Sequence, residues 1–377
     1  MRTLHHSFDV QHGLPTHPDV PQAARDLAED IAADQARRQR EAVEDRMRKV
    51  NETALTVRRA VIDLIGADTY PAFRHMLWTE RMRTREMFLP PDGLRADFDQ
   101  VHRARKERAD AFLRERGVAP ERLAALLRSG HNELKEHLPS PLEGMANDAC
   151  ALAPGLAGAM ASYTSPAAGM RAFAIHPPFD GWQKGFHFAN LIGSAFRGSH
   201  FNGVDPASGT LQQQIHLENN DASDLDFAEA VAHAQVAFWF QPSVSGRVRM
   251  TLEAQCQQST HSLRTVDEWG WSTSDTNQTN SLMMHVLHPN VSAPSFSLTS
   301  VFHWNTDVTQ SVFRSFIPIG TTVFATLTSE GTIPAGEWVV IRAGTQSTTS
   351  SITNDVEIHS TPDFRWLIRT VAIQMIP

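Results

Sequence analysis

The chain of 377 residues exceeds the usual length of one domain, and 41% hydrophobic with 20% charged residues is typical of a folded globular protein. Residues 1–138 hold 24 Lys and Arg against 23 Asp and Glu, a net charge of +1, whereas residues 139–377 hold 10 against 19, a net charge of −9. A balanced part followed by an acidic part lacks the basic surface that phosphate backbones require. We therefore expect no nucleic-acid partner.

The hydrophobic pattern of the sequence bears on where the protein is located in the cell. No apolar run reaches the roughly 18 residues that cross a bilayer, and the first residues have no apolar core of a secretory signal. We expect no integral membrane segment, and either a cytoplasmic location or export by a route without a Sec signal peptide. Arg supplies 30 of the 34 basic residues, which favours a bacterial source with a GC-rich genome.

Residues 1–18 are rich in His, Pro and Gly and show no period, so we predict a flexible arm there. A helical domain is predicted over residues 19–138. Its clearest signal is a seam of apolar residues that step by four and three, the a/d pattern of three heptads. The seam consists of Val43, Met47, Val50, Ala54, Val57, Val61 and Leu64. It predicts either the core stripe of a helical bundle within the chain or an intermolecular coiled coil, and its residues are our candidates for oligomerisation.

Arg40 stands where this seam would continue towards the N-terminus, so we expect the helix to bend or change partner near residues 34–42. Gly66 suits the C-cap of the helix, and further helices are predicted over residues 70–88, 94–116 and 120–137. Together these helices predict a four-helix bundle. Acidic and basic residues interleave on them, which indicates a solvated surface crossed by ion pairs.

Residues 139–170 are rich in Ala, Gly and Pro and predict a linker. From residue 171 onwards the period changes to two, as in half-buried antiparallel strands. Strands are expected near residues 211–217, 232–241, 248–256, 281–288, 296–304, 309–317, 322–328, 337–343, 355–359 and 365–376. The near-absence of helical patterns after residue 235 excludes parallel βαβ units. The expected fold class is α+β, with the helical domain followed by an antiparallel β-sandwich of jelly-roll type over residues 171–377.

The last of these strands is apolar on both faces. Trp366 and Ile368 are expected on one face, and Leu367, Val371 and Ile373 on the other. Such a strand is either central in its sheet or covered by the helical part.

The catalytic motifs that a sequence can reveal are absent. Ser194 lacks the GxSxG spacing of a nucleophile elbow, and neither a phosphate-binding loop nor an HExxH pair occurs. His285 and His288 would point to opposite faces of a strand, so we predict structural histidines. The cluster Asp221, Asp224 and Asp226 predicts either a calcium loop or a plain acidic loop.

Two cysteines, Cys150 and Cys256, are too few for a disulfide framework or a thiolate zinc site, and both one bridge and two free thiols stay open. We expect no enzymatic activity, no metal and no cofactor.

The most suggestive surface is aromatic. Trp269 and Trp271 flank a glycine, with Asp267 before them and Asp275 and Asn277 after them. Exposed aromatic faces beside carboxylates and amides hold sugar rings in many β-sandwich proteins, so these five residues are our candidates for glycan binding. The alternative is that the two tryptophans share one sheet face and fill the core.

The leading hypothesis is a non-enzymatic binding or assembly protein. Its helices would mediate self-association or docking to a protein partner, and its sandwich would contact a partner or ligand. A carbohydrate-binding or carbohydrate-active jelly roll is one alternative. A secreted effector or pore-forming toxin, whose amphipathic strands insert after the helices are released, is another.

Overall fold

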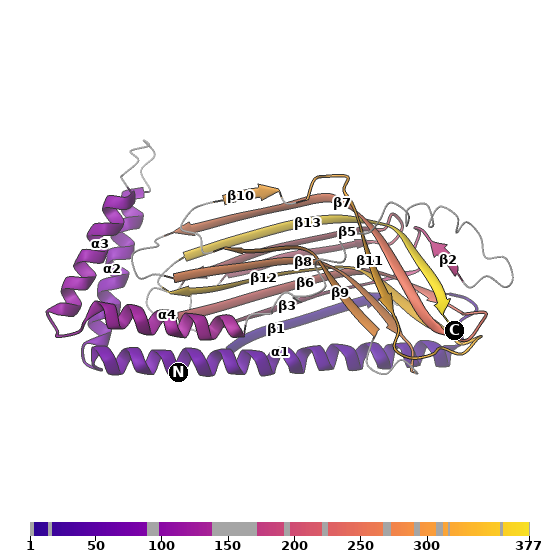
Figure 1. Ribbon diagram of the computed structural model, residues 1–377, viewed down its shortest axis with the longest axis horizontal. Helices are drawn as coiled ribbons and strands as arrows, with labels where there is room; N and C mark the ends of the chain where they lie inside the picture. The colour runs from indigo at the N-terminus through magenta and orange to yellow at the C-terminus, as the bar shows by residue number, and fades with distance from the viewer. Residues whose placement is uncertain are drawn as a thin grey trace.

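Three layers make up the protein (Figure 1): two antiparallel sheets stack as a sandwich, and helices cover the outer face of one of them. The structure is a computed structural model. It describes residues 4–13, 17–88, 98–137, 172–191, 197–220, 225–266, 273–289, 295–306, 312–315, 317–354 and 357–376. The predicted linker over residues 139–170 lies outside the described residues.

The sheet next to the helices, called sheet A, has six strands. In spatial order they are β1 (Leu4–Gly13), β3 (Gly181–Leu191), β6 (Leu225–Phe240), β12 (Val339–Asn354), β8 (Thr273–Leu287) and β9 (Ser295–Thr306). Sheet B has the order β10 (Val312–Ser315), β7 (Arg247–Val266), β13 (Glu357–Ile376), β5 (Thr210–Asn220) and β4 (Arg197–Asp205). The short strands β11 (Thr322–Thr328) and β2 (Ala172–Ile175) add to β7 and β13.

From β5 onwards the chain crosses repeatedly between the sheets, so that β5, β13 and β7 lie side by side in sheet B while β6, β12 and β8 do so in sheet A. This alternation is the strand order of a jelly roll. The antiparallel sandwich predicted from the period of two is therefore confirmed. Strands β3 and β4, which we did not predict, extend the two sheets beyond this core.

The sandwich interior is apolar at one end of the long strands and polar towards the other. Alternate residues of β7 from Val248 to Cys256 are fully buried against the other sheet. Further along, the Gln213 amide of sheet B donates to the carbonyl oxygen of Thr345 in sheet A at 2.7 Å, and Thr349 Oγ1 of sheet A lies 3.0 Å from Ser360 Oγ of sheet B. Polar groups with fixed partners in a buried layer specify how the two sheets sit on each other.

The N-terminal segment differs from the prediction of a flexible arm. Leu4–Gly13 form β1, which pairs with β3 along its whole length. Phe8 points to the helical side, where it lies 6.0 Å from the His187 ring and 5.1 Å below the Arg40 guanidinium. The pairing and these ring contacts hold the segment as an edge strand of sheet A.

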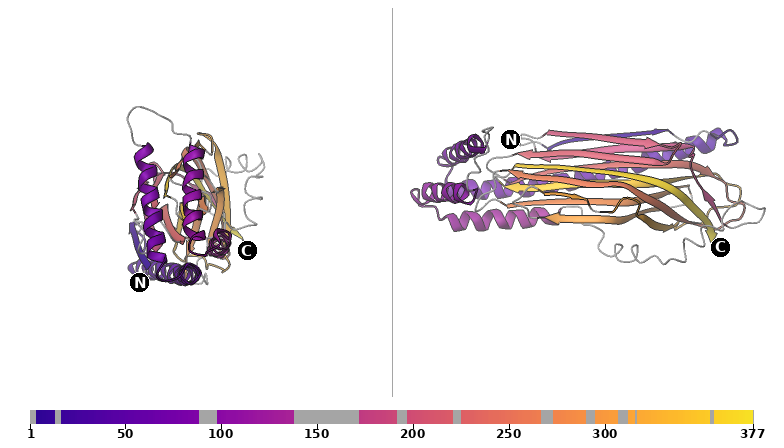
Figure 2. Two further views of the ribbon diagram at one scale, coloured as in Figure 1. Left: turned by 90° about the vertical axis from the view of Figure 1, so that its left-hand side faces the viewer. Right: turned by 90° about the horizontal axis from the view of Figure 1, so that it is seen from above.

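The helices are α1 (Gln22–Ile65), α2 (Tyr70–Phe88), α3 (Phe98–Arg114) and α4 (Pro120–Glu136). Helix α1 ends at the predicted Gly66, whose N–H donates to the Ile62 carbonyl oxygen at 2.8 Å and whose φ is 92°. α1 and α4 run along sheet A, whereas α2 and α3 stand side by side beyond the ends of the strands (Figure 2). The prediction of a self-contained helical bundle is not confirmed, because the sheet takes the place of part of the bundle core.

The heptad seam is packed within the chain. Met47 and Val50 are fully buried, Val57 and Val61 nearly so, and Val43 and Leu64 flank the same cluster. Their partners include Leu127 and Leu134 of α4 and Phe227 and Ile352 of sheet A. Self-association through the helices stays a prediction, and the same holds for a bound protein partner. Among the described helices, none is both long and apolar enough to cross a membrane.

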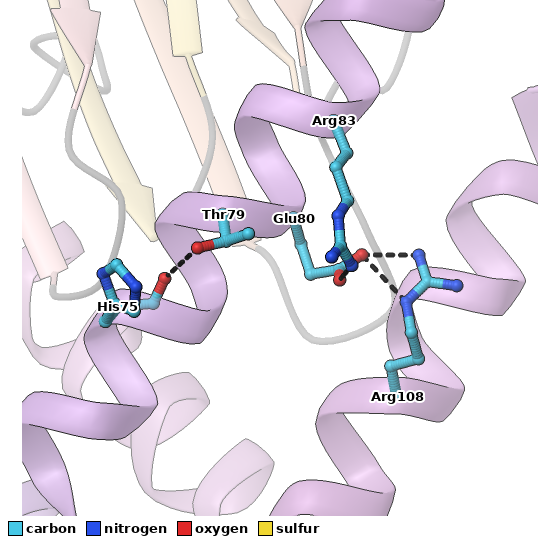
Figure 3. A network of polar contacts seen from close by, with 5 residues as sticks. All are labelled: His75, Thr79, Glu80, Arg83 and Arg108. Carbon is cyan, nitrogen blue, oxygen red and sulfur yellow. Dashed lines mark hydrogen bonds and ion pairs between the residues drawn. The ribbon is translucent and has the colours of Figure 1, made fainter.

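An ion-pair network joins α2 to α3 (Figure 3). The Glu80 carboxylate, 4% exposed, accepts from Arg83 Nη1 at 2.7 Å within α2 and from Arg108 Nε of α3 at 2.9 Å. We predict that Arg108→Ala lowers the free energy of unfolding by about 1.5 kcal/mol, because a buried carboxylate loses a charged donor. Urea denaturation measures this loss. Arg122→Ala, on an exposed side chain of α4, is the control, and an equal effect of both variants would contradict the role of the network.

Candidate functional site

The candidate glycan site predicted around Trp269 and Trp271 is described only in part, because residues 267–272, which include Asp267, lie outside the described residues. Asp275 and Asn277 lie on β8, where they are 3% and 5% exposed. The Asp275 carboxylate contacts His131 Nε2 and Lys135 Nζ of α4. In this structure Asp275 therefore anchors α4 on sheet A, and glycan binding by the five residues remains a prediction.

The other sequence candidates are dispersed. His285 is buried on the helical side of β8, whereas His288 Nε2 lies 2.7 Å from Glu337 Oε2, so the two rings have different surroundings. In the part of the chain that the structure describes, no three His, Cys, Asp or Glu side chains gather as a metal site. Asp226 is buried and accepts from the Phe227 N–H at 3.0 Å.

Cys256 is a buried free thiol, and burial raises its pKa to about 11. Ser194, Cys150, Asp221 and Asp224 lie outside the described residues.

An open cleft lies at one edge of the sandwich, where sheet A reaches further than sheet B. Strand β4, the last of sheet B, contacts β3 and β6, and leaves the neighbouring face of β1 uncovered. Asp9 and Gln11 are exposed on that face. The resulting hollow, here called the edge cleft, has a volume of about 240 Å³ and is lined by Asp9, Gln11, Lys184, Gly185, Phe186, His200, Phe201 and Asn202.

Asn202 forms the inner end of the edge cleft. Its Nδ2 donates to the carbonyl oxygens of Gly185 at 2.8 Å and His233 at 2.7 Å, so the side chain reaches from β4 across to sheet A. These two bonds fix the amide orientation. The Oδ1 atom is buried and accepts no hydrogen bond from the described residues, so Asn202 supports the base of the cleft and joins β4 to sheet A.

Aromatic rings form the wall of the cleft. Phe186 and His200 stack with their centroids 3.6 Å apart and their planes 5° from parallel. Phe201 follows His200 on β4 and so points to the other face of the strand, where its ring, 51% exposed, lies against Gly203. Burial, assisted by the charge of Lys184, lowers the pKa of His200, while Asp9 acts in the opposite direction. The His200 imidazole is therefore neutral at pH 7 and offers a flat face and one donor.

The rim of the cleft carries one carboxylate and one ammonium. Gln11 Nε2 donates to Asp9 Oδ2 at 3.1 Å, and Lys184 Nζ lies 5.5 Å from the Trp182 ring. The charges of Asp9 and Lys184 cancel, so the cleft favours a neutral ligand with many donors and acceptors. Asp9 is the one carboxylate among the described lining residues, whereas most glycoside hydrolases act through a carboxylate pair.

Sequence reasoning found none of the cleft residues. They come from β1, β3 and β4, which lie nearly two hundred residues apart at the extremes, and no short motif connects them. One signal was available: Ser7, Asp9 and Gln11 alternate with Phe8 and Val10, which is the period of a half-buried strand. The high His and Pro content of the segment masked that alternation.

Comparisons with known proteins give distant likenesses. No family model matches the chain, and no curated protein does. Among solved structures, TmCBM61 in complex with β-1,4-galactotriose covers 44% of this chain and 87% of its own at 7% identity, with a TM-score of 0.15. A carbohydrate-binding module from Cellvibrio mixtus lichenase 5A, in complex with cellotriose, covers 49% and 90% at 10% identity, with a TM-score of 0.16.

The Eiger TNF of S. frugiperda covers 48% of this chain and 93% of its own at 10% identity, again with a TM-score of 0.16. Likenesses of this size carry no argument about ligand or activity, so the function has to be argued from the edge cleft.

Proposed function

We propose that this protein binds a neutral glycan in the edge cleft and does not convert it. The observation that supports this most is the stacked pair of His200 and Phe186 beside the exposed side chains of Asp9 and Gln11. Sugar rings present an apolar face of C–H groups and an edge of hydroxyls, so an aromatic ring next to an amide and a carboxylate meets both requirements.

The size and openness of the cleft restrict what it can hold. Its volume of about 240 Å³ is below the roughly 300–1,000 Å³ of pockets that enclose drug-sized ligands. A cleft of this size takes one or two ring units, and its open side lets a longer chain continue into solvent. The side chains of Asp9 and Gln11, exposed on β1, are placed to accept from and donate to the hydroxyls of the bound unit.

A glycan array probed with the full chain tests the proposal. We predict binding to neutral oligosaccharides that falls at least about tenfold in His200→Ala, equivalent to about 1.4 kcal/mol, because the aromatic ring that stacks on the sugar is lost. Gln11→Ala is expected to weaken binding by a similar factor. Phe313→Ala is the matched control, since Phe313 is 71% exposed on β10 and does not line the cleft.

The pair of variants Trp269→Ala and Trp271→Ala compares the two candidate sites. Binding that is lost in these variants and retained in His200→Ala would move the site to the loop predicted from the sequence. A wild-type protein that binds no glycan on the array would refute the proposal.

A further inference from the structure

A cluster of basic side chains is enclosed between α1 and sheet A. Arg342 of β12 lies directly opposite His285 of β8, and the two are 2% and 4% exposed. His233 of β6 lies on the same face of sheet A. Its ring packs against Gly185, so closely that a Cβ atom at position 185 would lie 2.2 Å from the ring. These three residues are here called the basic cluster.

Helix α1 passes over this cluster. On one side, Leu287 and Val340, the next pair on this face of the β8–β12 ladder, pack with Ala28 in the N-terminal part of the helix and with Val20 just before it. On the other side, Phe227 and Ile352 pack with the heptad seam. The helix is unbroken between these contacts (Figure 1) and changes partner near residues 34–42, as expected from the sequence. The basic cluster occupies the gap between the two apolar contacts.

The charged neighbours of the cluster offer little compensation for added positive charge. From α1, Arg46 pairs with Glu229 of β6, and Arg40 lies over Phe8. From β3, His187 Nδ1 lies 3.9 Å from the same Glu229. From α4, His131 and Lys135 both contact Asp275 at the far end of β8. The described acids on this face, Glu229 and Asp275, thus already have cationic partners.

We propose that α1 is an acid-released cover: protonation of His233 and His285 beside Arg342 drives the helix off sheet A while the sandwich stays folded. Three positive charges under one helix repel each other, and the two apolar contacts on either side are the parts that must give way.

The direction of the pH dependence follows from the histidine pKa values. Burial, and after it the Arg342 charge, lowers the pKa of His285 to about 3 and that of His233 to about 4, against 6.5 in water. The covered state therefore keeps its full stability above pH 6.5, and loses it as the pH falls through the interval from 6.5 towards 4. Each histidine shifts the equilibrium towards release by up to about tenfold per pH unit.

Glu229 acts in the opposite direction. Burial raises its pKa, so it takes up a proton more readily in the covered state and offsets part of the histidine effect. Two histidines against one carboxylate leave a net drive towards release in acid. His261, buried between the two sheets with its pKa lowered to about 3, acts on the sandwich itself, so the test must separate helix release from unfolding.

Hydrogen–deuterium exchange of the full chain, corrected for the intrinsic pH dependence, makes that separation. Between about pH 7 and pH 4.5 we expect peptides from α1 to lose protection by at least about a hundredfold. Peptides from β13, whose Phe364–Met375 stretch lies in the apolar core, should retain theirs. Equal loss in α1 and β13, or no loss in α1, would overturn the proposal whatever the variants do.

The double variant His233→Gln/His285→Gln removes the titrating groups and is expected to keep α1 protected at about pH 4.5. His216→Gln is the matched control, since that half-buried histidine lies in sheet B, 3.0 Å from Thr361 Oγ1. It should release α1 at the wild-type pH. Release of α1 at the same pH in the double variant would also overturn the proposal.

Discussion

Asp275→Ala is expected to lower the free energy of unfolding by about 3 kcal/mol, because it leaves the buried His131 and the partly buried Lys135 without their shared carboxylate. Side-chain exposures of 4% for Asp275 and 6% for His131 place the contact in the interior. Removing one partner of a buried pair costs about 3–5 kcal/mol, and the 38% exposure of Lys135 favours the lower end of that range.

Urea denaturation of the variant measures this loss. Asp63→Ala, on an exposed side chain of α1, is the control and should change stability by less than about 0.5 kcal/mol. An Asp275→Ala protein as stable as the control, but impaired in glycan binding, would reinstate Asp275 as the ligand residue predicted from the sequence.

Trp366→Ala is expected to lower the free energy of unfolding by about 3–5 kcal/mol. The Trp366 side chain is fully buried in β13, and its Nε1 donates to Asn280 Oδ1 at 2.9 Å. Trp366→Phe keeps most of the apolar contact but leaves the Asn280 acceptor unpaired, so it should cost about 1–3 kcal/mol. Guanidinium denaturation of both variants gives the order of their stabilities. Leu367→Ala, at a half-buried residue of the same strand, serves for comparison. A Trp366→Phe variant as stable as the wild type would contradict the role of the hydrogen bond.

Strand β13 also shows a limit of predictions that rest on the period of two. We predicted either a central strand or one covered by the helical part, and β13 does lie between β7 and β5. The assignment of Val371 and Ile373 to the face opposite Trp366 was wrong, because register shifts in the pairing with β7 move the pattern by one residue between Ile368 and Thr370. A strict period of two cannot anticipate a bulge, since the bulge is fixed by the partner strand.

The helical seam shows a similar limit. The spacing from Val43 to Leu64 identifies a buried stripe, and the stripe is buried. What covers it depends on residues from α4 and from sheet A, such as Leu134 and Phe227, which no local pattern connects to α1. The edge cleft could not be predicted from the sequence for the same reason, because three strands that are distant in sequence meet there through sheet pairing.

The measurement that tests the central claim most directly is calorimetric titration of the full chain with a neutral oligosaccharide selected on the array. The edge-cleft proposal predicts one site per chain, a dissociation constant raised at least about tenfold in His200→Ala, and no change in Phe313→Ala. Equal affinity of the wild type and His200→Ala would place the glycan site elsewhere on the protein.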